Sequence, residues 1–188
     1  MSRIGWAVCG SFCTLAGILP VIEQLVSAGH EVTPILSEAV RDTDTRFIRA
    51  EAFRATIECT CGHRAIDSLV TAEPIGPRKL FDAIVVAPCT GNTLAKLANG
   101  ISDGTVTLAC KAHLRNGRPL IIAVSTNDAL AANATNLGQL LARRHVYFVP
   151  LGQDDPPEKP CSCVADFTKI PETINDALRG EQAQPLLV

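Results

Sequence analysis

Four short apolar runs of this chain are each followed by small hydroxyl, amide or glycine residues. These polar turns are Gly10-Ser11-Phe12, Ser37, residues 88–93 and residues 125–127. Side chains of this kind, with the backbone N–H groups at a helix start, can bind a phosphate monoester without a lysine. Serine, threonine and asparagine also cap helices, so one such turn is weak evidence of a site. Four of them after four predicted strands indicate a phosphate-binding cradle.

The elements that would position these turns follow from the hydrophobic pattern. Apolar, β-branched runs bounded by turn residues predict buried parallel strands at 3–9, 31–36, 82–87, 119–124 and 145–149. Helical patterns lie between them at 15–28, 43–56, 90–97, 103–116 and 127–143, and a last helix is predicted at 168–179. This alternation predicts an α/β fold with a doubly wound, mainly parallel sheet, of the Rossmann or flavodoxin-like three-layer type.

We expect residues 1–188 to form a single domain, with 152–188 as a C-terminal loop, helix and tail. Pro20 should kink the first helix or shift its start. In an open parallel sheet, ligands bind at the carboxyl ends of strands, near the point where the strand order reverses. Gly10 and Gly91 would let the backbone approach such a ligand closely. The first turn does not follow the G-x-G-x-x-G pattern of dinucleotide-binding folds. The second strand ends at Ser37, where those folds have an acidic residue. Both features favour a mononucleotide over a dinucleotide as the ligand.

Composition excludes several classes of function. The net charge is −2 and the charges are interspersed, which argues against a nucleic-acid partner. No apolar run approaches the ~20 residues of a membrane span, and the N-terminus lacks the layout of a signal peptide, so we expect a cytoplasmic protein without membrane contact. Cys59, Cys61, Cys161 and Cys163, with His63, are conceivable zinc ligands, but their spacing favours free thiols and no bound metal.

The run PCTGNTLAKLANGISD, residues 88–103, resembles the P-A-S/T-A-N-T…K-x-A-x-G-x-x-D signature of the flavoproteins that include cysteine decarboxylases and flavin prenyltransferases. This resemblance implies bound FMN. It also implies a division of the cofactor contacts among the turns. Gly10, Ser11 and Phe12 would hold one side of the phosphate, Ser37 would reach the phosphate or ribityl chain, and the cradle would be closed by Pro88, Thr90, Asn92 and Thr93.

Further runs resemble the B-subunit family of the dipicolinate synthases within these flavoproteins. They include AEPIGP at 72–77, ACKAHLRN at 109–116 and FVPLGQDDP at 148–156. The resemblance implies oxidation of dihydrodipicolinate to dipicolinate in the mother cell of a sporulating bacterium. It also implies a partner A subunit, which could carry NAD(P), and a homo-oligomer, either a trimer or a dodecamer.

The catalytic motifs of the decarboxylases are only partly present. Asn127 matches the asparagine that engages a substrate carboxylate in those enzymes, but the flanking methionines are absent. Pro74 stands where the decarboxylases keep a histidine. Decarboxylation of a peptidyl cysteine is therefore disfavoured, although an FMN-binding decarboxylase or prenyltransferase remains an alternative. A noncatalytic assembly subunit is the other alternative.

A substrate with two carboxylates needs cationic or amide partners. Lys111 and Arg115, four residues apart on one helix face, are candidates for substrate binding, and a solvated surface pair is the alternative. Glu73 is a candidate general base, or a contact to a neighbouring subunit. His113 is a further candidate for proton exchange near neutral pH.

Overall fold

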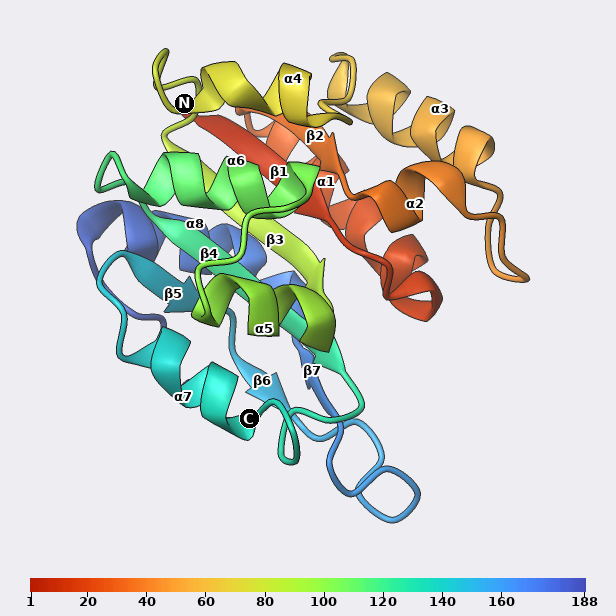
Figure 1. Cartoon of the computed structure of the whole chain (residues 1–188), viewed down its shortest axis with the longest axis vertical. Helices are drawn as coiled ribbons and strands as arrows, with labels where there is room; N and C mark the ends of the chain where they lie inside the picture. Colours follow the sequence, from red (N-terminus) through yellow and green to blue (C-terminus); the bar gives the residue numbers. More distant parts are fainter.

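The strands form one sheet whose central members are almost wholly buried. In the computed structural model, which describes residues 1–188, seven strands are arranged in the order β2-β1-β3-β4-β7-β6, and β5 also pairs with β4 (Figure 1). Their bounds are β1 (Arg3–Val8), β2 (Glu31–Leu36), β3 (Ala83–Cys89), β4 (Leu120–Thr126), β5 (Val146–Phe148), β6 (Leu151–Gly152) and β7 (Cys163–Ala165). The pairs among β1 to β5 are parallel, and β7 runs antiparallel to β4 and β6. The predicted α/β fold with a mainly parallel sheet is confirmed.

Helices cover both faces of this sheet. Their bounds are α1 (Leu15–Ser27), α2 (Glu38–Asp42), α3 (Ala50–Cys61), α4 (Leu69–Ala72), α5 (Gly91–Ala98), α6 (Thr105–Leu114), α7 (Ala134–Leu141) and α8 (Ile170–Arg179). The helices α1 and α8 pack on one face, whereas α5, α6 and α7 pack on the other (Figure 1). The three layers form one domain. None of these helices is both long and apolar enough to cross a membrane.

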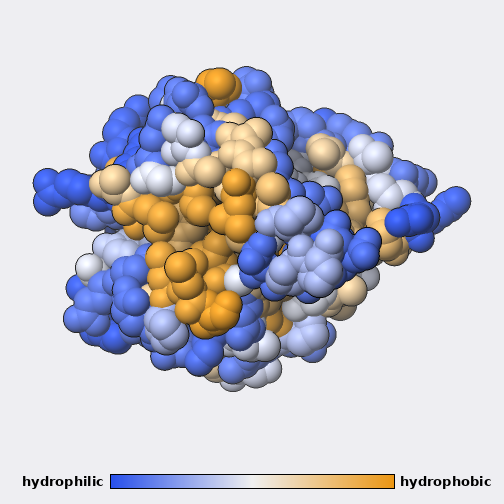
Figure 2. All heavy atoms as spheres, turned by 90° about the horizontal axis from the view of Figure 1, so that it is seen from below, coloured by the Kyte–Doolittle hydropathy of each residue, from blue (hydrophilic) through white to orange (hydrophobic).

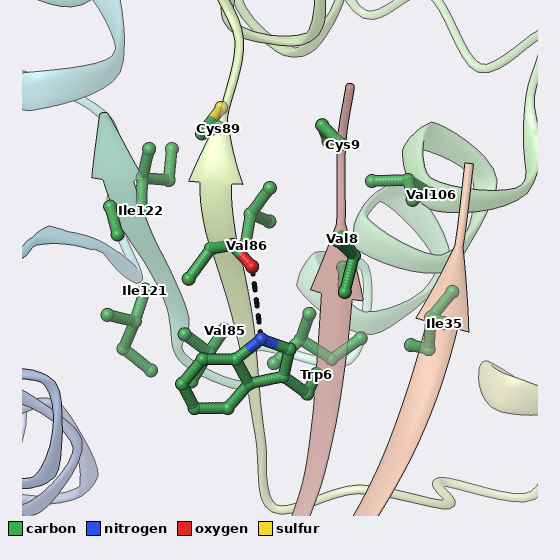
Figure 3. Packing of buried hydrophobic residues seen from close by; sticks show 14 of the residues in the cluster. Trp6, Val8, Cys9, Ile35, Val85, Val86, Cys89, Val106, Ile121 and Ile122 are labelled. Carbon is green, nitrogen blue, oxygen red and sulfur yellow. Dashed lines mark hydrogen bonds between the residues drawn. The ribbon is translucent and has the colours of Figure 1, made fainter. Parts of the chain in front are cut away.

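The pairing of β1 with β3 is held by a buried tryptophan. Trp6 is fully buried, and its indole Nε1 donates a 3.0 Å hydrogen bond to the Ala87 carbonyl oxygen (Figure 3). A buried indole N–H needs such an acceptor, because leaving it unpaired costs free energy. The bond joins the middle of β1 to the end of β3, where the β3–β4 register shifts between Val86 and Cys89. It thus fixes where the chain leaves β3 relative to β1.

Two predicted helices begin later than expected, the first of them because polar side chains bind the backbone instead. The helix predicted at 43–56 is replaced by a loop followed by α3. In that loop, Thr45 Oγ1 accepts from the Phe47 and Ile48 N–H groups, and Asp44 accepts from the Ala50 N–H. Such local bonds compete with helix formation. Residues 127–133 of the predicted helix 127–143 form turns, in which the Ala131 and Asn133 N–H groups both donate to the Asp128 carbonyl oxygen, and α7 begins at residue 134.

Short elements were missed. Pro20 lies inside α1, which begins at Leu15 as predicted, so Pro20 does not shift the start of the helix. The strands β6 and β7, with two and three residues, are too short to show a two-residue period in the sequence. Part of the segment predicted as a C-terminal loop and tail thus belongs to the sheet. The four-residue α4 was missed for the same reason.

His113 is buried and serves the packing of α6. It is 1% exposed, and its Nε2 donates to the Pro119 carbonyl oxygen at 3.0 Å. Burial lowers the pKa of this imidazole to about 4, although the bond to Pro119 opposes that shift. The side chain is therefore neutral at neutral pH, and the predicted proton exchange near neutral pH is wrong.

This pKa predicts a pH-dependent stability. His113 has a pKa near 6.5 when unfolded and about 4 when folded, so the unfolded chain binds more protons between these values. Its contribution to the free energy of unfolding should be complete above pH 6.5 and decrease by about 3 kcal/mol as the pH falls to 4. Urea unfolding at pH 7 and pH 4 should show a smaller decrease in His113→Gln, which keeps a donor for Pro119. An identical decrease in both proteins would contradict this assignment.

Candidate functional site

The turns after β1 and β3 lie side by side, although about 80 residues separate them in the sequence. The Cys9 N–H donates to the Pro88 carbonyl oxygen at 3.3 Å, and Thr93 Oγ1 donates to Cys9 Sγ at 3.3 Å. Since β2 flanks β1 and β4 flanks β3, the strand order reverses between β1 and β3. Flavodoxin-like sheets bind their ligands at this point.

A first cavity, cavity A, opens at the carboxyl ends of β1, β2 and β3 and has a volume of about 410 Å³. It brings together five of the predicted cofactor-binding residues, namely Gly10, Ser37, Thr90, Asn92 and Thr93. Pro88 lies within β3 and lines neither this cavity nor its neighbour. The predicted gathering of three strand-end turns is therefore present in the structure.

The donors in cavity A are hydroxyl, amide and backbone groups. Thr90 Oγ1 accepts from the Thr93 N–H at 3.3 Å and Ser37 Oγ accepts from the Val40 N–H at 3.4 Å, so both residues cap helices. Asn92 is exposed at the first turn of α5 and makes no hydrogen bond within the chain. Its amide is free to bind a ligand beside the positive end of the α5 dipole.

Two charged side chains line cavity A, and each already has a partner. Glu38 Oε1 accepts from the Thr105 N–H at 2.8 Å and from the Thr105 hydroxyl at 2.9 Å. Burial opposes ionisation of Glu38, but these bonds and Arg41 outweigh it and lower its pKa. Lys96 Nζ lies 2.8 Å from Asp103 Oδ1. An anionic group in cavity A would thus rely mainly on the uncharged donors.

A second cavity, cavity B, adjoins the first and has a volume of about 350 Å³. Both cavities are lined by Gly10 and Thr90, and cavity B adds Ser11, Phe12 and Asn127 from the predicted set. Ser11 Oγ lies 2.9 Å from Ser125 Oγ in a small cluster of hydroxyl groups. Cavities A and B together form one extended site across the ends of the four strands.

The turn that carries Asn127 is held by a polar network around Asp128. Asp128 accepts from Thr126 Oγ1 at 2.5 Å and from Asn133 Nδ2 at 2.8 Å. Gly91 packs directly against this network, since a Cβ at Gly91 would lie 2.5 Å from Asn133 Nδ2. The close approach expected at Gly91 is therefore to the β4 turn, and Gly91 lines neither cavity.

Cavity B also contains side chains that sequence reasoning did not assign to a site. Phe47 comes from the loop before α3, and Asp154 and Lys159 come from the loop between β6 and β7. Lys159 Nζ lies 3.1 Å from Asp154 Oδ2. The charged and proline-rich character of residues 152–163 was visible in the sequence, but nothing there showed that this loop reaches the end of β1.

The three remaining predicted residues lie together in a different place. Glu73, Lys111 and Arg115 line a third cavity, cavity C, with a volume of about 200 Å³. Cavity C shares no lining residue with cavity A or cavity B. The predicted common face of Lys111 and Arg115 is present, but these cations do not reach Asn127 within one chain.

The thiols near the site are buried and protonated. Burial raises the pKa of Cys9 to about 11 and raises that of Cys89 well above its usual value. Neither thiol is available as a thiolate nucleophile at neutral pH. All eight cysteines are free, and no group of three or more His, Cys, Asp or Glu side chains could hold a metal ion.

Comparison with known proteins places this chain in one family. The family model described as Flavoprotein matches residues 1–178. The B subunit of dipicolinate synthase from Bacillus subtilis is 47% identical over 186 residues, which are 99% of this chain and 93% of that protein. The crystal structure of the dipicolinate synthase B subunit from Bacillus halodurans superposes with a TM-score of 0.92 at 43% identity, covering 100% of this chain and 96% of that one.

A more distant neighbour is the crystal structure of the FMN-dependent cysteine decarboxylase TvaF from thioviridamide biosynthesis. It is 28% identical and has a TM-score of 0.59, covering 76% of this chain and 86% of that one. The resemblances predicted from the sequence to dipicolinate synthase B subunits and to flavoproteins are confirmed.

The close packing around Gly91 predicts that adding a single methyl group there lowers the free energy of unfolding. In Gly91→Ala, the new Cβ would also lie 2.7 Å from Asp128 Oδ1 and Thr126 Oγ1, so the network must move. We expect the free energy of unfolding to decrease by about 1 to 3 kcal/mol in urea titrations. Gly138→Ala is the matched control, because its Cβ would meet open space inside α7 and should stabilise the helix by about 0.5 to 1 kcal/mol. Equal effects of the two substitutions would contradict the packing described here.

Proposed function

Since the chain belongs to the Flavoprotein family, we propose that cavities A and B hold FMN and that the protein acts as the B subunit of a dipicolinate synthase. The observation that carries the cofactor assignment is the meeting of the strand-end turns at the β1/β3 switch point, where they line two adjoining cavities. The specific activity is supported by the 47% identity to the B subunit of a dipicolinate synthase over nearly the whole chain.

The donor set of cavity A fits the phosphate and ribityl groups of FMN. Asn92 has a free amide, and the first N–H groups of α5 are those that a helix leaves without internal partners. The Gly10 N–H also donates to no backbone carbonyl. We assign the phosphate and ribityl contacts to Gly10, Ser37, Thr90, Asn92 and Thr93. Ser11 and Phe12 would contact the part of the cofactor in cavity B.

The proposed reaction is the oxidation of dihydrodipicolinate to dipicolinate, in which the ring loses two hydrogens and becomes aromatic. FMN would supply the acceptor for the hydride, and the second hydrogen would leave as a proton to a general base or to water. The chain itself would orient the substrate, and Asn127 is placed for this in cavity B, next to the end of β4. Decarboxylation is less well supported, because Pro74 replaces the histidine of the decarboxylases.

The proposed roles of Glu73 as a general base and of Lys111 and Arg115 in substrate binding need a second chain. Within one chain, cavity C is separate from cavities A and B. These residues would act on a substrate only if they are brought to its site by a neighbouring copy, in a trimer or dodecamer, or by an A subunit. Figure 2 shows a continuous apolar area on the face seen from below, and large apolar patches are typical of interaction surfaces.

The proposal includes a partner and a cellular setting. A dipicolinate synthase A subunit would complete the enzyme and could contribute NAD(P). By the same resemblance, the protein would act in the cytoplasm of the mother cell of a spore-forming bacterium.

The cofactor assignment predicts a measurable loss of affinity when Asn92 is truncated. Asn92→Ala removes a proposed charge-assisted contact to the FMN phosphate and should weaken FMN binding by about 1 to 3 kcal/mol, or about 5- to 150-fold. The measurement is the quenching of flavin fluorescence when the flavin-free chain is titrated into FMN, alone and with the A subunit.

Asn175→Ala is the matched control, since Asn175 is located on α8 and lines neither cavity. It should leave the FMN affinity unchanged. Equal affinities of the Asn92→Ala chain and the unmodified chain would remove the β3 turn from the site. Absence of any FMN binding under both conditions would assign the chemistry to the A subunit and leave this chain with a role in assembly.

A further inference from the structure

Cavity B contains one cationic side chain, that of Lys159. A substrate with carboxylate groups that is oxidised at cavities A and B needs a cation close to that place, and Lys111 and Arg115 lie in cavity C. We propose that Lys159, together with Asn127, binds a carboxylate of the substrate in cavity B and determines the preference for an anionic ring compound. This inference rests on the function proposed above and names a residue of its substrate site.

Lys159 is held at cavity B by the structure of its own loop. Its backbone N–H donates to the Asp155 carbonyl oxygen at 2.6 Å, and its carbonyl oxygen accepts from the Ser162 N–H at 3.0 Å. Gln153 Nε2 closes the loop by donating to the Pro160 carbonyl oxygen at 2.8 Å. The loop begins and ends at the antiparallel pair β6 and β7. The hydrogen bonds within this loop, and its attachment to β6 and β7, therefore hold Lys159 in place.

The ammonium group of Lys159 has donors to spare. One N–H is directed to Asp154 Oδ2 at 3.1 Å, and two remain for a ligand. Both partners are partly exposed, with side-chain exposures of 48% for Lys159 and 31% for Asp154. Ion pairs of this kind are weak, so a ligand carboxylate can share or replace Asp154. The bond to Asp154 raises the pKa of Lys159, which keeps the group charged at neutral pH.

Asn127 supplies a second donor from a different element. Its Oδ1 accepts from the Ser162 hydroxyl at 3.4 Å, which leaves the amide N–H groups of Asn127 unpaired. Asn127 comes from the turn after β4 and Lys159 from the loop before β7, yet both line cavity B. An ammonium and an amide that line the same cavity can each donate a hydrogen bond to a carboxylate.

Cavity B has one aromatic side chain that the cofactor assignment does not use. Phe47 precedes α3 and lines cavity B. Aromatic side chains offer large, rigid contact surfaces to a planar ligand. A planar ring that carries a carboxylate therefore suits this cavity beside the part of the cofactor that Phe12 contacts.

The test is calorimetric titration of the FMN-loaded chain with pyridine-2,6-dicarboxylate. Lys159→Met keeps most of the length of the side chain but removes the charge, and it should weaken binding about 10-fold or more, the effect of losing one charge-assisted hydrogen bond. Lys159→Arg should restore most of the affinity. Asp154→Asn should not weaken binding, because it releases Lys159 from its partner.

Lys169→Met is the matched control. Lys169 is 50% exposed and pairs with Glu172 at 3.2 Å, so it resembles Lys159 in exposure and pairing but lines neither cavity. The Lys169→Met chain should bind pyridine-2,6-dicarboxylate with the same affinity as the unmodified chain. Flavin fluorescence titration gives the FMN affinity of each variant, so that the pyridine-2,6-dicarboxylate affinities are compared at flavin saturation.

The outcomes separate this inference from the proposed function. If FMN binds but Lys159→Met takes up pyridine-2,6-dicarboxylate as well as the unmodified chain, the role of Lys159 is overturned. A loss in Lys111→Met but not in Lys159→Met would also overturn it and would place the ligand in cavity C. If the chain does not bind FMN at all, the proposed function is overturned, and with it the substrate site at Lys159 that rests on that function.

Discussion

The parallel pairing of β1 with β3 is the constraint on which the rest of the structure depends. It brings the turns that follow residues 8 and 89 to the same edge of the sheet, and β2 and β4 add their ends on either side. The buried bond from Trp6 to the Ala87 carbonyl oxygen and the bond from Cys9 to Pro88 hold the ends of β1 and β3 together. Cavities A and B lie at this edge and are lined by the polar residues at the strand ends.

The polar residues at this edge have two roles. Thr90 and Ser37 cap α5 and α2, and both also line cavity A. A capped helix start is already ordered, so a ligand that binds there loses little additional chain entropy. Charge is scarce at the site, because Lys96 and Glu38 are engaged with neighbours. The C-terminal loop supplies the cation that the parallel part of the sheet lacks.

The sequence predicted the parallel core and the meeting of its turns, because buried strands and strand-end residues have local signals. It did not predict α2 or the loop before α3, where the bonds of Asp44 and Thr45 to the backbone override the helical pattern. It predicted the common face of Lys111 and Arg115, but it could not show that Glu73 joins them in cavity C, apart from Asn127. Lys159 and Phe47 were not predicted as site residues, because only tertiary packing brings their loops to the end of β1.

If the β1/β3 edge is the flavin site, a crystal structure of the full chain grown with FMN should show flavin density across cavities A and B, with the phosphate beside Gly10 and Asn92. Flavin density confined to cavity C, or to a surface away from the strand ends, would show that the strand-end turns do not bind the flavin.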